Sequence, residues 1–354
     1  MSKDLSPWKT THRTDNFVFQ LVDPHNLDIV DGELTSVVLD GFSITEDYTS
    51  DNLVTGSLTA ISDEYGIDDG WWIRIIHSVP EFSYSEELAT LVPSSYSHKY
   101  INNSYTTKYT LQSALWSMAD DLLPWHFTIG SGQTVKQAFS RICHFADQDF
   151  RIPSSARDYR YNETVVYEMS DSLLDILYDL AGAANDIIDL DGHGRIVLKP
   201  YNVISSREPD WVIDADSSDS IVLDKGISWD EDHSDVYNRE IVVYKNKDTE
   251  IVGYANADPI SKFSDEKVGY TRAQIHQEND LDPATTEHAA QKARQYLALQ
   301  LDHHIERSIT CMYFPVRQGE IVQLTINGKT TKCLAINVER NFSDMTVGLT
   351  LREA

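Results

Sequence analysis

The sequence predicts a mainly β protein of the α+β class, with two antiparallel β-barrel domains and an α+β insert between them. Three observations lead to this prediction. The first hundred residues alternate apolar and polar side chains in short runs, the period then changes to that of helices, and strand patterns return in the last part of the chain. We expect domains at residues 1–125, 126–218 and 219–354, the last with one long helix.

Short alternating runs fill the N-terminal part of the chain. These runs are Phe17 to Val22, Leu34 to Leu39, Leu53 to Ala60 and Trp71 to Ile76. Turn dipeptides separate them at Asp31-Gly32, Asp40-Gly41 and Asp69-Gly70. Strands at a spacing of about 8–12 residues are typical of antiparallel sandwiches and small barrels, and not of parallel sheets.

The middle of the chain has helical periodicity. Apolar side chains recur at this spacing at Leu111, Leu115, Met118, Ala119 and Leu122. They predict a helix that ends at Pro124. Thr134 and Gln137 form a capping-box pattern for a second helix. A third helix begins near Ser170 or Ser172 and leads into a hairpin with its turn at 191–194.

Strand patterns return in the C-terminal part. A long strand is expected at 235–244 with a partner at 251–254, and a helix opens at Asp282-Pro283, where proline suits the first helical position. Four strands follow, at 305–312, 320–326, 332–338 and 345–351. The Asn327-Gly328 pair predicts a tight hairpin turn between the middle two.

The chain is strongly acidic along its whole length. Its 354 residues include 29 Lys and Arg against 56 Asp and Glu, a formal net charge of −27. Such a surface discourages contact with phosphate backbones, so nucleic acid is not an expected binding partner. No run approaches the roughly 18 apolar residues of a membrane helix, and the N-terminus lacks the apolar core of a secretion signal. We therefore expect folding in a cytoplasm and no stable membrane insertion.

Several short motifs resemble functional sites but lack essential parts. The segment 189–194 (Asp-Leu-Asp-Gly-His-Gly) resembles the start of a calcium loop, yet the remaining ligands are missing and a plain turn is the better interpretation. Gly130 to Thr134 precedes a helix like a phosphate loop, but it has no lysine and the wrong spacing. This segment is better explained as a flexible loop that precedes the helix.

Metal and nucleophile sites have no support in the sequence. His288, the His303-His304 pair and Glu306 lack the spacing of known zinc sites. Three cysteines, at positions 143, 311 and 333, are too scattered for a disulfide framework and are expected to be reduced and buried. No serine lies in a nucleophile elbow. We predict no catalytic, cofactor-binding or metal-binding residues.

Carboxylates and tryptophans leave two alternatives open. Acidic clusters occur at Asp68-Asp69, Asp120-Asp121 and Asp230-Glu231-Asp232. They are expected to be solvated loop faces, although a glycosidase-like carboxylate pair needs only a suitable distance between two acids. Trp71-Trp72, Trp116 and Trp125 are expected in the core. An exposed tryptophan would favour carbohydrate binding.

Four stretches stand in a particular order along the chain. The first is Leu34 to Ala60, with Ile44 to Tyr48 between its strands, followed by Gly70 to Ile75, and the second is Tyr109 to Trp116. The third is Thr134 to Phe139 with Ser172 to Leu177 and Asp189 to Ile196. The fourth is Ala289 to Arg294 with Phe314 to Leu324, Lys332 to Ile336 and Met345 to Leu351. In this order they resemble the phage tail baseplate hub proteins, the trimeric hubs of tail tips. Glu320 stands where aspartate is frequent in that family.

The resemblance implies two β-barrels per subunit and a homotrimer whose six barrels adapt a sixfold tail tube to a threefold tip. It also implies contacts with the tail tube or distal tail protein on one side and with a spike, fibre or tape measure protein on the other. The resemblance further implies that the protein is assembled in the host cytoplasm and is then located in the virion. Because the chain ends directly after its last strand, no hydrolase or fibre-binding extension is expected.

The main hypothesis is therefore a structural, non-enzymatic hub subunit whose ring closes through open sheet edges. An acidic lumen would let DNA pass without specific binding. The alternatives are a tail-associated cell-wall hydrolase with a carboxylate pair and a carbohydrate-binding receptor module.

Overall fold

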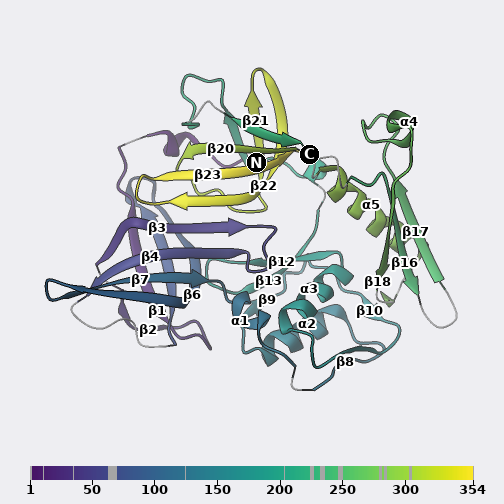
Figure 1. The fold of residues 1–354 in the computed structure, drawn as a ribbon, viewed down its shortest axis with the longest axis horizontal. Helices are drawn as coiled ribbons and strands as arrows, with labels where there is room; N and C mark the ends of the chain where they lie inside the picture. The colour runs from purple at the N-terminus through teal and green to yellow at the C-terminus, as the bar shows by residue number, and fades with distance from the viewer. Residues whose placement is uncertain are drawn as a thin grey trace.

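The computed structural model describes the chain except for residues 1, 11, 35, 63–69, 124, 203, 224–226, 232–235, 246–249, 279–280, 283–284, 303–304 and 354. Four parts can be distinguished in Figure 1: N-terminal strands at the left, C-terminal strands at the top, a helical middle part at the bottom and a small sheet with a long helix at the right. We call them the N-terminal, C-terminal, middle and small modules.

The N-terminal module consists of seven strands among the described residues. They are β1 (Asn16–Val22), β2 (Ile29–Glu33), β3 (Val37–Asp47), β4 (Val54–Ser62), β5 (Trp72–Val79), β6 (Tyr84–Ile101) and β7 (Ser104–Gln112). They pair antiparallel in the order β3-β4-β7-β6-β5-β1-β2. The segment predicted to lie between strands, from Ile44, belongs to β3 as far as Asp47, and the chain turns only after it.

The C-terminal module contains six described strands. They are β14 (Trp211–Asp214), β15 (Ser228–Glu231), β20 (Ile305–Met312), β21 (Ile321–Ile326), β22 (Lys329–Asn341) and β23 (Thr346–Glu353). The predicted Asn327-Gly328 turn joins β21 and β22, and both residues have positive φ, 52° and 74°, as a tight hairpin turn of this kind requires.

Strands β3 and β22 join the two modules into one sheet. They pair antiparallel from Asp47 opposite Asn337 to Ser43 opposite Asn341. The result is a thirteen-stranded sheet that runs through both modules, with β15 and β2 at the ends of its main path and β14 at the end of a branch through β21. The mainly β fold class is confirmed, whereas no pattern in the sequence predicts this pairing. Closure of each module into a barrel stays a prediction.

The middle module combines short strands with three helices. Its elements are α1 (Leu115–Ala119), β8 (Phe127–Ile129), α2 (Val135–Phe145), β9 (Phe150–Arg151), β10 (Arg160–Tyr161), β11 (Val165–Tyr167), α3 (Leu173–Ala183), β12 (Asp186–Leu190) and β13 (Ile196–Pro200). The capping box of Thr134 and Gln137 begins α2 as predicted, and Ser172 caps α3. The first predicted helix is shorter than expected, because Leu111 belongs to β7, where pairing with β4 and β6 overrides the helical spacing.

The small module packs one long helix on a three-stranded sheet. It consists of β16 (Arg239–Lys245), β17 (Glu250–Asn256), β18 (Ala273–Glu278), α4 (Asp265–Val268) and α5 (Thr286–Asp302), and β19 (Leu281–Asp282) pairs with β10. Its core is separate and contains Val242, Tyr244, Ala255, Ala289, Ala293 and Leu297. A larger core cluster is shared by the other three modules. The domain boundaries predicted after residues 125 and 218 stay predictions.

Short 3-10 helices complete the description, at Ser6–Lys9, Pro80–Phe82 and Ile204–Ser206. None of the helices in the described part of the chain combines the length and the apolarity that crossing a bilayer requires. All three cysteines are free and buried, as the sequence predicts.

Candidate functional site

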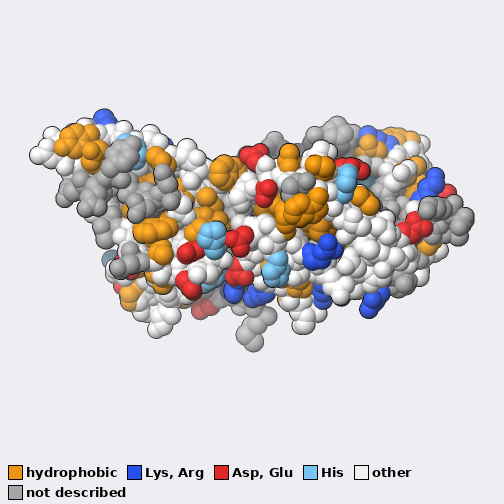
Figure 2. Space-filling view, turned by 90° about the horizontal axis from the view of Figure 1, so that it is seen from below, with side chains coloured by type: hydrophobic (Ala, Val, Ile, Leu, Met, Phe, Trp, Pro, Cys, Tyr) orange, Lys and Arg blue, Asp and Glu red, His pale blue; other side chains and the backbone are white. Residues whose placement is uncertain are grey.

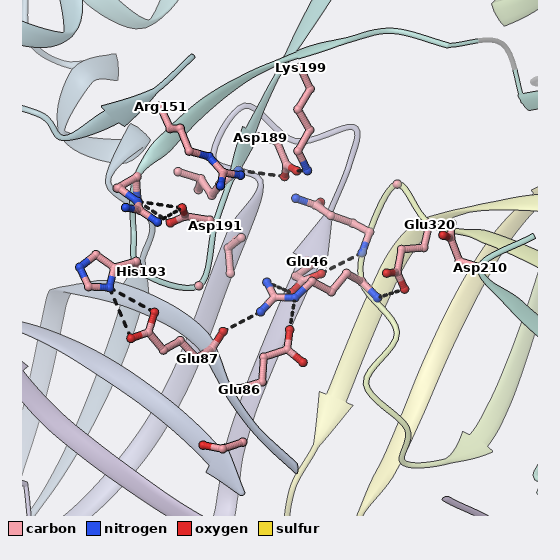
Figure 3. A pocket seen from close by; sticks show the side chains of 18 of the residues that line it. Glu46, Glu86, Glu87, Arg151, Asp189, Asp191, His193, Lys199, Asp210 and Glu320 are labelled. Carbon is pink, nitrogen blue, oxygen red and sulfur yellow. Dashed lines mark hydrogen bonds and ion pairs between the residues drawn. The ribbon is translucent and has the colours of Figure 1, made fainter. Parts of the chain in front are cut away.

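A charged cleft of about 670 Å³ lies where three modules meet, and we call it the junction cleft. Its walls come from β3 and β6, from the β12–β13 hairpin and from the loop before β21. In Figure 3, Asp189, Asp191 and Lys199 lie on one side, Glu320 and Asp210 on the other, and Glu46 near the centre. Because nearly all of these side chains are charged, their pairing decides what the cleft can do.

Glu46 and Arg340 form the buried centre of this cleft. They lie on the paired strands β3 and β22, with only 2% and 1% of each residue exposed. Arg340 Nη1 lies 2.9 Å from Glu46 Oε1, and the backbone N–H of Gln318 donates to Glu46 Oε2 at 2.8 Å. The ion pair therefore joins the N-terminal and C-terminal modules at the point where their strands meet.

Arg317 extends this network to β6. Its Nη1 lies 3.6 Å from Glu46 Oε1, and its Nε donates to Glu86 Oε1 at 2.9 Å. Its Nη2 donates to the backbone carbonyls of Glu87 and Leu88, at 2.7 and 3.1 Å. One guanidinium thus satisfies two carboxylates and two carbonyls of the N-terminal module, as its fixed set of donors allows.

The carboxylates of this network are held in the charged form. Burial alone would raise the pKa of Glu46, but the charges of Arg340 and Arg317 hold it below its ordinary value. Burial would likewise raise the pKa of Glu86, while Arg317 and a hydrogen bond from Tyr84 lower it. A glycosidase acid needs the opposite shift, a raised pKa that keeps its proton near neutral pH. Neither carboxylate is suited to that role.

The β12–β13 hairpin is docked on β6 through its glycine-rich turn. A Cβ at Gly192 would lie 1.8 Å from the carbonyl oxygen of Glu87, so only glycine permits this approach. The Thr90 hydroxyl donates to the Gly192 carbonyl at 2.9 Å. The sequence correctly predicts a turn here, but the close packing on β6, about a hundred residues away in the chain, was not predicted.

His193 fixes the same turn from the side. Its Nε2 lies 3.1 Å from Arg74 Nη2 and its Nδ1 lies 3.1 Å from Glu87 Oε2. Because a guanidinium can only donate, Nε2 accepts from Arg74 and Nδ1 donates to Glu87. These two contacts give the imidazole a positioning role for the hairpin.

The calcium-like residues of this turn are used within the turn itself. Asp191 accepts from the backbone N–H of Arg195 at 3.0 Å and pairs with its guanidinium at 2.8 Å, and Asp189 pairs with Lys199. Among the described residues no group of three or more His, Cys, Asp or Glu side chains is arranged to hold a metal ion.

The other sequence candidates are scattered. Thr134, from the loop that resembled a phosphate loop, caps α2 through its hydroxyl. Glu306 pairs with Arg352 at 3.0 Å, and His288 is buried in the small module. Asp120-Asp121 is exposed. The His303-His304 pair, Asp68-Asp69 and Asp232 lie outside the described residues.

The small module meets the middle module along a buried polar seam. Lys292 of α5 is 3% exposed, donates to the carbonyl of Gly182 in α3 and lies 4.0 Å from Glu278 Oε2. Burial lowers the pKa of Lys292. The side-chain nitrogen and oxygen of Asn185 and the Nε2 of His288 are buried without a hydrogen-bond partner in the described part of the chain. Buried atoms without a hydrogen-bond partner among the described residues also occur at the junction cleft, for example Arg340 Nε and Gln318 Oε1, so the two contacts differ in their charge pairing.

Asp186 and Arg157 lie in the same seam. Asp186 Oδ2 accepts from the backbone N–H of Arg157 at 2.9 Å, and Arg157 Nη2 donates to the carbonyl of Tyr201 at 3.1 Å. Burial raises the pKa of Asp186 to about 6 despite its contacts with Arg157. This carboxyl is 4% exposed and faces packed protein, so its raised pKa bears on stability.

Two of the seven tryptophans are exposed. Trp8, Trp72 and Trp211 are buried, Trp71 and Trp116 are partly buried, Trp125 is 56% exposed and Trp229 is 62% exposed. Trp125 was expected in the core. It lies against Phe145 on the middle module, with ring centroids 5.1 Å apart. Seen from below, this side of the molecule carries apolar groups among charged ones (Figure 2).

Trp229 lies beside a second cavity. A groove of about 540 Å³ on the C-terminal module is lined by Ala215, Asp216, Val222, Ile227, Trp229, Arg307, Ile326, Asn327, Lys329 and Thr331. We call it the Trp229 groove. Apolar side chains make up a larger share of its lining than in the junction cleft.

Comparison with known proteins identifies the fold. No family model and no curated protein matches the sequence. A tail protein from Neisseria meningitidis matches in structure with a TM-score of 0.67 and 12% identity, over 96% of this chain and 97% of that one. The 43 kDa tail protein of prophage MuSo2 from Shewanella oneidensis matches with a TM-score of 0.63 and 12% identity, over 96% and 98%. The prophage tail protein gp18 from Listeria monocytogenes matches with a TM-score of 0.59 and 13% identity, over 95% and 94%.

These matches extend through all four modules and leave little of either chain uncovered. The chain has the fold of phage tail proteins, in agreement with the resemblance to tail hub proteins.

Proposed function

We propose that this chain is a structural, non-enzymatic subunit at the tip of a phage tail or of a related particle. The observation that carries the proposal is the fold match along nearly the whole length of three tail proteins. As the resemblance to hub proteins implies, three copies would form a ring between a sixfold tail tube and a threefold tip. Its neighbours would be the tail tube or distal tail protein and a spike, fibre or tape measure protein, with assembly in the host cytoplasm.

The construction of the sheet supports a structural role. Among the described residues the thirteen-stranded sheet has three terminal strands, β2, β14 and β15, and a terminal strand presents backbone groups that a neighbouring chain can pair with. A contact between two different terminal strands of neighbouring copies is of the head-to-tail type, which forms a ring when the rotation between copies closes. We expect each contact to bury more than about 2,000 Å², as permanent interfaces do.

The charge of the chain suits a passage for DNA. With a net charge of −27, acidic side chains facing the lumen of a ring would repel phosphates and allow DNA to pass without specific binding.

The state of the carboxylates in the junction cleft speaks against the hydrolase alternative. Glu46 and Glu86 are paired with arginines, and their pKa values lie below the ordinary range. Neither can supply the proton that glycosidic bond cleavage requires.

Native mass spectrometry of the purified chain tests the ring. Three copies per assembly are expected, and a monomer at all concentrations would contradict the proposal. Zymography on peptidoglycan tests the enzymatic alternative. No cleared band is expected, whereas a band that disappears in Glu86→Gln would establish a hydrolase.

A further inference from the structure

The Trp229 groove differs from the other surfaces in the way its walls are built. One wall is the indole of Trp229, 62% exposed on the terminal strand β15. Apolar side chains of Val222, Ile227 and Ile326 line it together with polar ones. A concave site that combines apolar side chains with a few polar groups is the usual form of a small-ligand site.

The polar rim of the groove is held in place by surrounding contacts. Arg307 donates to Glu353 Oε2 from Nε and Nη2, at 3.2 and 2.6 Å, and Lys329 donates to Glu353 Oε1 at 3.3 Å. Asp216 accepts from the backbone N–H groups of Asn327 and Gly328, at 2.8 and 2.7 Å. The rim is thus ordered before any ligand arrives, which reduces the entropy lost on binding.

The charges of the rim cancel one another. Arg307 and Lys329 are offset by Glu353 and Asp216, and the pKa values of both carboxyls are lowered: hydrogen bonds to the two backbone amides lower that of Asp216, and the two cations outweigh burial at Glu353. A site for phosphate or carboxylate would leave its cations without an anionic partner. Arg307 has five N–H donors and Lys329 three, more than their bonds to Glu353 use, and such donors suit hydroxyl groups where the described side chains of the rim are balanced in charge.

We propose that the Trp229 groove binds a pyranose ring of a neutral glycan. One apolar C–H face of the sugar packs on the electron-rich face of the Trp229 indole, and the hydroxyl groups at the ring edge accept hydrogen bonds from the Arg307 guanidinium and the Lys329 ammonium. The Arg307 guanidinium lies over one face of the indole, with Cζ 6.0 Å from the ring centre, and the sugar is expected on the opposite face of this 62% exposed ring. A volume of about 540 Å³ accommodates a short oligosaccharide.

Trp125 provides a matched comparison. It is exposed to a similar extent, 56%, but its ring lies against Phe145 at an interplanar angle of 77°. It does not line the Trp229 groove or the junction cleft. A sugar that merely adheres to exposed indoles would use both tryptophans equally.

Isothermal titration of the full chain with chitotriose, maltotriose and mannotriose tests the proposal. At least one of these probes should bind the wild type. Trp229→Ala should weaken that binding about tenfold or more, Trp229→Phe should restore part of it, and Lys329→Ala should cause a smaller loss. Trp125→Ala should leave affinity unchanged. Circular dichroism and the thermal midpoint of each variant verify that it is folded.

Three results would overturn the proposal. They are the absence of binding by any of the three probes, equal affinity in wild type and Trp229→Ala, and equal losses in Trp229→Ala and Trp125→Ala. If Trp229→Ala instead dissociates an assembly of copies and no probe binds, the groove is a contact between subunits and the glycan proposal is wrong. The proposed tail function does not depend on any of these outcomes.

Discussion

The junction cleft and the seam of the small module are both buried polar contacts between modules, yet they differ in their charge pairing. Both contain buried polar atoms without a hydrogen-bond partner in the described part of the chain. In the junction cleft, Glu46 has two arginines and a backbone N–H as partners. In the seam, Lys292 faces a carbonyl and a carboxylate 4.0 Å away.

The difference shows which contact depends on charge. A buried carboxylate between two arginines is stabilised by both positive charges. Removal of one of the three side chains leaves the remaining charges buried without compensation. A single weakly paired lysine gains little from its charge after desolvation. We therefore expect the seam to open before the junction does, because contacts between parts of a protein differ in local stability.

The largest effect is expected from Glu46→Gln. This change leaves Arg340 without a counter-charge and Arg317 with Glu86 alone. It should reduce the free energy of unfolding by about 3–5 kcal/mol. Urea denaturation measures it. Glu339→Gln, an exposed glutamate next to Arg340 in sequence, is the control and should change stability by less than about 0.5 kcal/mol. Equal effects of the two changes would mean that the ion pair contributes nothing to the joining of the modules.

Gly192→Ala should have the next largest effect. Its Cβ would collide with the carbonyl of Glu87, so the hairpin must shift from β6 at a cost of about 1–3 kcal/mol. The thermal midpoint and hydrogen exchange of β12 and β13 measure the shift. Gly182→Ala is the control, since its Cβ would meet nothing within 4 Å and alanine in a helix stabilises by about 0.5–1 kcal/mol. A stable Gly192→Ala variant with protected hairpin amides would argue against docking.

Lys292→Met should have a much smaller effect. The carbonyl of Gly182 still accepts from the backbone N–H of Asn185 at 3.0 Å, and Glu278 keeps its hydrogen bond from the Tyr296 hydroxyl. An apolar side chain of similar length therefore costs at most about 1 kcal/mol in urea denaturation. A loss as large as that of Glu46→Gln would remove the contrast between the two contacts.

The smallest effect is a pH trend at Asp186. Burial raises its pKa in the folded protein from 3.8 to about 6, so protonation favours folding. Its stabilising contribution is fully present below the unfolded value and is lost as the pH rises through about 6. Between pH 5 and 7 the wild type should therefore lose stability relative to Asp186→Asn, measured as urea midpoints.

Asp216→Asn is the control for this trend. Hydrogen bonds from two backbone amides lower the pKa of Asp216, so its titration lies below this range and no difference should develop between pH 5 and 7. A constant difference between wild type and Asp186→Asn would mean that Asp186 does not titrate there.

Local signals in the sequence predict much of the fold. The caps at Thr134 and Ser172, the Asn327-Gly328 turn and the alternation of the C-terminal strands all correspond to elements of the structure. These signals depend on neighbouring residues only. The prediction that a helix begins at Leu111 was wrong, because pairing with neighbouring strands makes this segment a strand. The periodicity of the sequence gives no information about these strand partners.

The candidate site was much less predictable. Glu46 and Arg340 occupy inward positions of alternating strands, with Phe42 and Ile44 before Glu46 and Val338 and Phe342 around Arg340. A charge at such a position is a sign of a buried pair, but alternation alone does not reveal its partner. The exposure of Trp229 depends on the position of β15 at the end of the sheet, a tertiary property.

The pairing of β3 with β22 also has a consequence for synthesis on the ribosome. Residue 46 is translated about 290 residues before Arg340, so the N-terminal strands wait for all of this intervening chain before their neighbour β22 is made. During that interval Glu46 and the edge of β3 are open to solvent and to other nascent chains. Synthesis of β22 is therefore the step that completes this half of the molecule, and a chain truncated before residue 340 is expected to be prone to aggregation.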